Sequence, residues 1–206
     1  MKVDIYNTDK KYNIIYADPP WRYKVWSKKG MGRSAENHYK TMSKEELQGM
    51  ANVISRISDK NAVLFLWVTA PCLMEGMELI EKWGFTYKTI GFTWIKQNKN
   101  ADSLFWGMGY YTRANAELCL LATKGKPLPR LRRDIHSVIL SRIEEHSKKP
   151  DETRERIVAL FGDLPRIELF ARQHVNGWDC WGDEIPEIRR IKDGMDTSER
   201  KVTRLC

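Results

Sequence analysis

Residues Asn13 to Trp21 read NIIYADPPW and carry the strongest signal for the fold. The opening residues of this stretch are apolar and partly β-branched, which is typical of a buried strand. Pro19 and Pro20 then lack the amide hydrogens that a central strand would donate, so the strand must end at Asp18. A buried strand that runs directly into a rigid loop is therefore predicted.

The following segments alternate between helical and strand patterns. Ser43 opens a capping box ahead of apolar residues spaced by three and four, which predicts one helix over 44–57. The unbroken apolar run Ala62–Val68 predicts a central strand covered on both faces. A second helix is predicted from Pro71 to Gly84, with an apolar face made of Leu73, Met74, Met77, Ile80 and Trp83.

The remaining pattern completes an α/β chain. Strands are predicted over 86–96, 117–122, 136–140 and 166–170, with a helix that starts at Lys149-Pro150-Asp151-Glu152 and ends at Gly162. Strands that alternate with such helices favour three layers around a mainly parallel sheet, which binds ligands beyond the carboxyl ends of its strands. We therefore expect the loops 18–21 and 168–174 to lie side by side.

Length and composition limit the remaining choices. The chain has 206 residues, with 42% hydrophobic and 30% charged, so one domain over 1–186 and a basic tail over 187–206 are expected. The longest apolar run is short and the first residues, MKVDIYNTDKKY, resemble no signal peptide, so we expect a cytoplasmic protein without a membrane partner. Four cysteines without a C-x-x-C pair indicate reduced thiols, and neither a zinc site nor another metal site is expected.

The tetrapeptide Asp18-Pro19-Pro20-Trp21 combines an acceptor side chain, a stiff backbone and a flat aromatic ring. An aromatic amine is a poor nucleophile, and two acceptors that hold its hydrogens help its nitrogen become tetrahedral. Asp18 and the Pro19 carbonyl are candidates for these acceptors, and Trp21 is a candidate for stacking on an extruded base. Alternatively, the prolines only end the strand and Trp21 packs in the core.

At this point the sequence resembles the MT-A70 family of S-adenosylmethionine-dependent adenine-N6 methyltransferases, over residues 12–186. The shared stretches, in order, are 17–21 (ADPPW), 38–43 (HYKTMS), 64–69 (LFLWVT), 116–120 (AELCL), 146–152 (HSKKPDE) and 167–172 (IELFAR). The resemblance implies a Rossmann-like methyltransferase fold with the catalytic motif N-terminal and the cofactor motif C-terminal. It further implies that residues 18–21 form the catalytic loop, that Tyr39 contacts the target adenine and that Glu117 lines the substrate pocket.

The resemblance also implies a site for the methyl donor, S-adenosylmethionine. His146 and Lys149 match an H-x-x-K-P element in which the lysine meets the donor's carboxylate, close to a helix N-terminus. Glu168 would hold the ribose hydroxyls, and Asp18 would also contact the donor. The other residues that the resemblance places around the donor are Arg172, Gln173 and His174, together with Asp183 and Glu184, which stand where the eukaryotic members carry amides.

Basic residues point to a nucleic-acid partner. The net charge is +8, and residues 22–33 hold five basic and no acidic residues, among which Lys24 and Trp26 are candidates for substrate contact. Residues 125–149 carry seven basic and three acidic residues, and the glycine- and aromatic-rich loop 97–113 is expected to act as a mobile lid over a flat ligand. Solvated loops that only keep the protein soluble are the alternative.

The predicted activity is methylation of adenine in DNA, as in compact bacterial and phage relatives. Methylation of RNA adenine and a catalytically inactive nucleic-acid-binding role are alternatives. Methylation of a protein glutamine is disfavoured because that reaction uses Asn where this chain has Asp18. Homodimers and heterodimers are both compatible with the resemblance.

Overall fold

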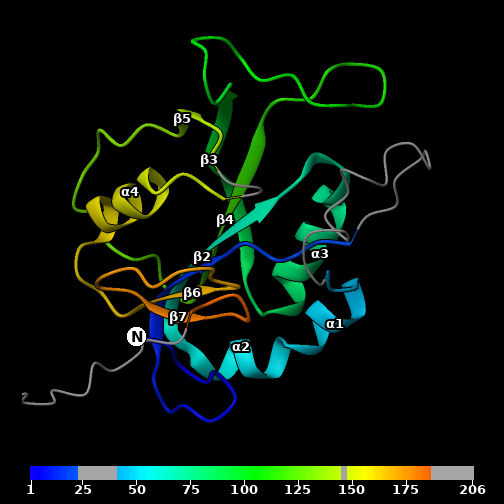
Figure 1. Cartoon of the computed structure of the whole chain (residues 1–206). Helices are drawn as coiled ribbons and strands as arrows, with labels where there is room; N and C mark the ends of the chain where they lie inside the picture. The colour runs from blue at the N-terminus through cyan, green and yellow to red at the C-terminus, as the bar shows by residue number, and fades with distance from the viewer. Residues whose placement is uncertain (23–40, 145–147, 187–206) are drawn as a thin grey trace, which may run out of the picture.

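The structure of the chain is a computed structural model that describes residues 1–22, 41–144 and 148–186. Seven strands form one mixed sheet in the order β5-β3-β4-β2-β1-β6-β7 (Figure 1). β4 is antiparallel to both of its neighbours and the other pairings are parallel, so β4 alone of these strands runs in the opposite direction. The strands are β1 (Tyr12–Ala17), β2 (Ser58–Val68), β3 (Thr86–Gln97), β4 (Glu117–Lys124), β5 (Val138–Arg142), β6 (Arg166–Leu169) and β7 (Asp179–Trp181).

Helices cover both faces of the sheet because side chains alternate along the central strands. Ile15 and Ala17 of β1 point into one core cluster, which also holds side chains of the helices α1 (Lys44–Gly49), α2 (Ala51–Ile57) and α3 (Leu73–Lys82). Ile14 and Tyr16 point into the other, together with Ile157 of α4 (Glu152–Phe161). The α/β architecture is therefore confirmed, and it is consistent with a Rossmann-like methyltransferase fold.

The local details depart from the pattern at several places. The helix predicted over 44–57 is broken at Met50 into α1 and α2, and the start of the next helix is a 3₁₀ turn, η3 (Ala70–Cys72). Met74 was placed on the inner face but is 69% exposed. The last predicted strand ends one residue early, because Phe170 has a φ of 60° and turns the chain away from the sheet. The short strand β7 was not predicted.

The strand order brings both suspected loops to one edge. Ala17 pairs with Leu169 at the carboxyl ends of β1 and β6, so residue 18 and residue 170 leave adjacent parallel strands, as predicted. Because β4 is antiparallel, it begins at this same edge, where Leu118 pairs with Val68 at the end of β2. We call this side of the sheet the carboxyl edge.

Two further findings concern the described residues. None of their helices is long and apolar enough to cross a membrane. Cys72, Cys119 and Cys180 are buried free thiols, and no cluster of candidate metal ligands occurs among these residues. The expected tail, 187–206, lies outside the described part of the chain.

Candidate active site

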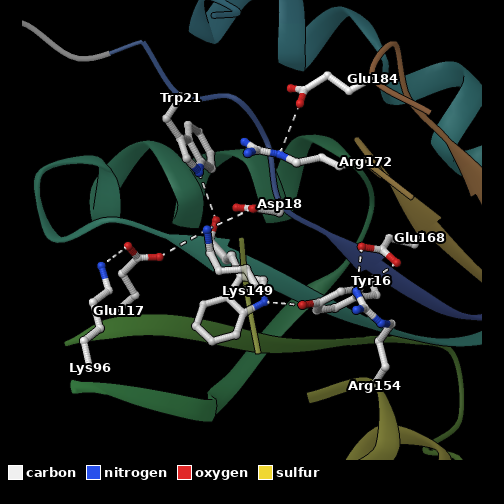
Figure 2. A network of polar contacts seen from close by, with 11 residues as sticks. Tyr16, Asp18, Trp21, Lys96, Glu117, Lys149, Arg154, Glu168, Arg172 and Glu184 are labelled. Atoms are coloured by element: carbon white, nitrogen blue, oxygen red, sulfur yellow. Dashed lines mark hydrogen bonds and ion pairs between the residues drawn. The ribbon is translucent and has the colours of Figure 1, made fainter. Parts of the chain in front are cut away.

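Four charged side chains from four separate segments meet at the carboxyl edge (Figure 2). The Lys149 ammonium lies between two carboxylates, 2.9 Å from Oδ2 of Asp18 and 3.2 Å from Oε2 of Glu117. Glu117 uses its other oxygen to bind Lys96, which stands on the neighbouring strand β3. The Lys149 side chain is only 9% exposed, so it is not the solvated surface lysine of the alternative interpretation.

Burial and charge oppose each other in this network. Burial raises the pKa of Asp18 above its ordinary value, and the nearby Lys149 reduces that rise without cancelling it. Burial also acts to raise the pKa of Glu117, but Lys149 and Lys96 together outweigh it and hold this pKa low. For Lys149, burial acts to lower the pKa, and the two carboxylates outweigh it and raise the pKa. Lys149 therefore stays charged, and Glu117 stays ionised beside it.

The loop after β1 is held in place by its own backbone and by the core. The amide of Trp21 donates to the Pro19 carbonyl at 2.8 Å, and the amide of Met42 donates to the Pro20 carbonyl at 2.8 Å. The tight turn from Pro19 to Trp21, centred on Pro20, fixes the direction of the Pro19 carbonyl and leaves one lone pair of that oxygen for a second donor. The Asp18 side chain remains 19% exposed at the mouth of this turn.

Trp21 itself packs in the core. Its ring is 7% exposed and belongs to the cluster under α1 to α3. Its Nε1 donates to the carbonyl of Trp67 at 2.9 Å, and Nε1 of Trp67 donates to the Tyr16 hydroxyl at 2.8 Å (Figure 2). Trp21 therefore anchors the loop to β2, in agreement with the core alternative of the sequence analysis.

Glu168 is already engaged by a second buried cation. Nη1 of Arg154, on α4, donates to both carboxylate oxygens at 3.0 and 3.2 Å. Burial raises the pKa of Glu168 to about 7, helped by the charge of Asp18 and opposed by Arg154. A carboxylate offers about four lone-pair positions, so Glu168 can accept ribose hydroxyls only at those that Arg154 leaves.

The remaining predicted donor contacts surround the turn after β6. Arg172 lies 3.8 Å from a carboxylate oxygen of Glu184, and Nε2 of Gln173 donates to Asp151 at 3.3 Å. His174 contacts the Pro186 carbonyl through Nε2 at 3.1 Å, and Asp183 is exposed. The structure thus brings Arg172 and Glu184 together, while Gln173 and His174 bind the protein's own groups.

The turn is kept close to β7 without a glycine of its own. The amide of Ala171 donates to the carbonyl of Trp181 at 2.9 Å, and the rings of Phe170 and Trp181 pack edge to face at 5.4 Å. A methyl group on Gly182 would come within 2.3 Å of the Ala171 carbonyl oxygen, so the close approach requires glycine at position 182. A non-glycine residue with positive φ next to a predicted site is a form of local strain found at functional sites.

Several basic residues of the predicted segment 125–149 are paired or turned away from the site, and most of the segment 22–33 lies outside the described residues. Lys149 points into the network, and Arg132, Arg142 and Lys148 form ion pairs with nearby acids. The amide of Leu131 donates to Leu160 in the last turn of α4, so the segment that carries Arg132 lies toward the opposite edge of the sheet. A cleft of about 570 Å³ at that opposite edge, lined by Lys10, Tyr12 and Arg166 among others, involves none of the residues predicted for the site.

Sequence reasoning reached some of these residues and missed others. Lys96 and Arg154 were not singled out, although each forms an ion pair with a predicted site residue. Side chains alternate along β3, so Lys96 lies on the same face as Trp94, which stands opposite Glu117 in the sheet. That alternation was the available signal for Lys96. The predicted contacts Lys24, Trp26, Tyr39 and His146 lie outside the described residues.

Known methyltransferases are similar to this chain over most of its length. The type II methyltransferase M.MunI of a Mycoplasma species is 38% identical over 86% of this chain and 79% of its own length. An Arabidopsis thaliana N(6)-adenosine-methyltransferase MT-A70-like protein is 31% identical over 94% of the chain, and the human N(6)-adenosine-methyltransferase catalytic subunit METTL3 is 28% identical over 88%. The chain spans only 26% and 29% of these two longer relatives. The MT-A70 family model matches residues 12–184, and the chain therefore belongs to the MT-A70 family.

Proposed function

We propose that this chain transfers a methyl group from S-adenosylmethionine to the N6 amine of adenine in DNA. The observation that carries the proposal is the Asp18 carboxylate, which Lys149 holds at the end of β1 beside the turn of β6. The similarity of the chain to a bacterial type II methyltransferase favours DNA as the substrate and the cytoplasm as the site of action. The similarity to N(6)-adenosine-methyltransferases supports adenine N6 as the accepting atom and keeps RNA as the second candidate.

In the proposed reaction the donor supplies a methyl carbon bound to a sulfonium sulfur. The adenine N6 lone pair would form the new N–C bond while the S–C bond breaks, its electron pair staying on sulfur as a neutral thioether. N6 would then lose one proton, to the Asp18 carboxylate and from there to water. Asp18 and the Pro19 carbonyl accept hydrogen bonds from the two N6 hydrogens, which moves nitrogen electron density out of the ring. The Pro19 carbonyl is already oriented by Trp21, so this acceptor needs no reorganisation during the reaction.

The residues present fit such a donor at one end of the site. Lys149 is a buried ammonium beside the carboxyl edge, where a donor carboxylate can replace Asp18 as its partner. That exchange would release the Asp18 oxygen for the adenine amine. Arg172 and Glu168 would frame the adenosine part.

The test is to incubate the purified chain with the donor and either DNA or RNA, and to analyse the nucleosides by mass spectrometry. N6-methyladenine in DNA is expected, and its appearance only in RNA would move the assignment to the second candidate. Asp18→Ala should lower turnover by at least about 100-fold while donor affinity stays within about tenfold, because the acceptor acts mainly in the transition state. A wild-type chain without transfer to either polymer would leave the inactive nucleic-acid-binding alternative.

A further inference from the structure

Residues 98–116, the β3–β4 loop, expose an unusual set of large apolar side chains. Trp106 is 55% exposed and Tyr111 is 94% exposed, and Met108 and Tyr110 are also exposed. In Figure 1 the loop projects beyond the ends of β3 and β4, away from the rest of the fold. Aromatic rings gathered in this way in water mark a surface that a partner covers.

The backbone of the loop is braced by hydrogen bonds from its own side chains. Asn115 donates to the carbonyls of Lys96 and Phe105 and accepts from the Lys96 amide. Arg113 donates to the Trp106 carbonyl at 3.0 Å. Such bracing holds the backbone that carries the rings before a partner arrives, so less backbone entropy is lost on binding.

The tip of the loop depends on a glycine. A methyl group on Gly109 would lie 2.1 Å from the carbonyl oxygen of Thr112, so only glycine permits the tight turn that presents Tyr110 and Tyr111. Those two rings pack edge to face, with their centres 4.8 Å apart. The tip therefore has a defined shape.

Both stems of the loop start in the charge network of the site. Lys96 precedes the loop and Glu117 follows it, and the two form an ion pair beside Lys149. The loop contains Lys99 and Arg113 against one acid, Asp102, and the exposed Arg142 of β5 contacts the Lys99 carbonyl at 3.3 Å. Flat rings with a basic surplus at the carboxyl edge complement a nucleic-acid strand that enters the site.

We propose that the β3–β4 loop stacks Trp106 and Tyr111 on unpaired or unstacked bases that flank the target adenine. This inference rests on the proposed function and names how its substrate is held outside the reacting centre. The loop thereby recovers part of the free energy that extrusion of the adenine costs. Single-stranded or distorted substrate is preferred, since a stacked duplex offers no free base faces to the loop.

The test is the affinity for a fluorescent single-stranded oligonucleotide with one adenine, measured by anisotropy without donor. Trp106→Ala and Tyr111→Ala should each weaken binding about five- to hundredfold, the range for a lost base–aromatic stack. Leu131→Ala removes an apolar side chain that is 68% exposed toward the opposite edge and should bind as the wild type does. With abasic sites beside the adenine, the difference between wild type and Trp106→Ala should disappear.

Two results would overturn the stacking role. One is wild-type affinity in both aromatic variants, and the other is a difference that persists at abasic flanks. Light scattering on the same variants tests whether the loop binds a second copy of the chain instead. A wild-type dimer that Trp106→Ala dissociates, with unchanged oligonucleotide affinity, would assign the loop to dimer formation and overturn the stacking role. Methyl transfer is measured separately, so a wild type that binds but does not methylate contradicts the proposed function and leaves the stacking result standing.

Discussion

Lys149 is the residue on which the charge balance of the site depends. It is the cation between Asp18 and Glu117, and its removal leaves two buried carboxylates to repel each other. We expect Lys149→Met to lower the free energy of unfolding by about 3 to 5 kcal/mol and the donor affinity by at least about tenfold. Urea denaturation and donor titration calorimetry measure the two effects.

Two companion variants separate charge from folding in this experiment. Adding Asp18→Asn to Lys149→Met removes the carboxylate whose ion pair was lost, whereas Glu117 keeps Lys96, so part of the stability should return while donor affinity stays low. Lys148→Met removes a neighbouring lysine whose partners are exposed acids and should cost less than about 1 kcal/mol. Equal losses for the two lysines would contradict the buried position assigned to Lys149.

Glu168 gives the site a dependence on pH near neutrality. Its pKa rises from 4.5 to about 7 in the folded chain, so the folded state holds more protons between these values than the unfolded state. Stability from this group is therefore complete below pH 4.5 and is lost as the pH rises through 7. The loss amounts to about 3 kcal/mol.

Glu168→Gln isolates that dependence. The difference in unfolding free energy between wild type and variant should fall from pH 5 to pH 8 and then stay constant, as followed by urea denaturation. The variant also loses the ion pair with Arg154, which changes its unfolding free energy by the same amount at every pH and therefore creates no dependence on pH. Curves that stay parallel over this range would show that Glu168 does not titrate there.

At the scale of elements, the approach of β7 to the turn after β6 controls where Arg172 stands. Gly182→Ala would press a methyl group on the backbone of residue 171, and we expect a loss of about 1 to 3 kcal/mol in stability together with weaker donor binding. Gly49→Ala is the matched control, because a methyl group there meets open space and favours α1. Thermal unfolding and donor titration compare the two variants. Wild-type stability and donor affinity in Gly182→Ala would show that the turn after β6 can move away from β7.

The elements that the sequence predicted are those whose signal is local. The Ser43 capping box and the apolar runs of β1 and β2 depend on neighbours in the chain, and both are present. The break at Met50 was hidden because the apolar spacing continues across it, and Met50 stays buried. β7 has only three residues, too few for a period to show.

The contacts that the sequence could not predict depend on the order of the strands. Lys96 and Glu117 meet only because β4 runs antiparallel beside β3, and no pattern within 117–122 reveals its direction. Arg154 and Glu168 meet because α4 packs on the face toward which Glu168 points. Pairings of this kind follow from tertiary packing, whereas the residue types that suit a methyltransferase site are visible in the chain itself.

Charge is distributed unevenly between the two edges of the sheet. Arg130 and Arg133 are exposed, and they belong to the same segment as Leu131, whose amide donates to Leu160 in the last turn of α4. Because α4 leads to the start of β6, this segment lies toward the edge of the sheet away from Asp18. Lys99 and Arg142 stand at the carboxyl edge, close to both stems of the β3–β4 loop. The net charge of +8 alone therefore does not identify the edge of the sheet that attracts nucleic acid.

The salt dependence of oligonucleotide binding distinguishes the two edges. Each phosphate contact contributes about −0.9 to the slope of log affinity against log salt, or about −0.7 on a single strand. Replacing Lys99 and Arg142 together by Gln should make the slope shallower by about one to two, whereas replacing Arg130 and Arg133 by Gln should leave it unchanged. Both double variants lose two positive charges, so a general attraction by net charge would change the two slopes equally and would contradict a binding face at the carboxyl edge.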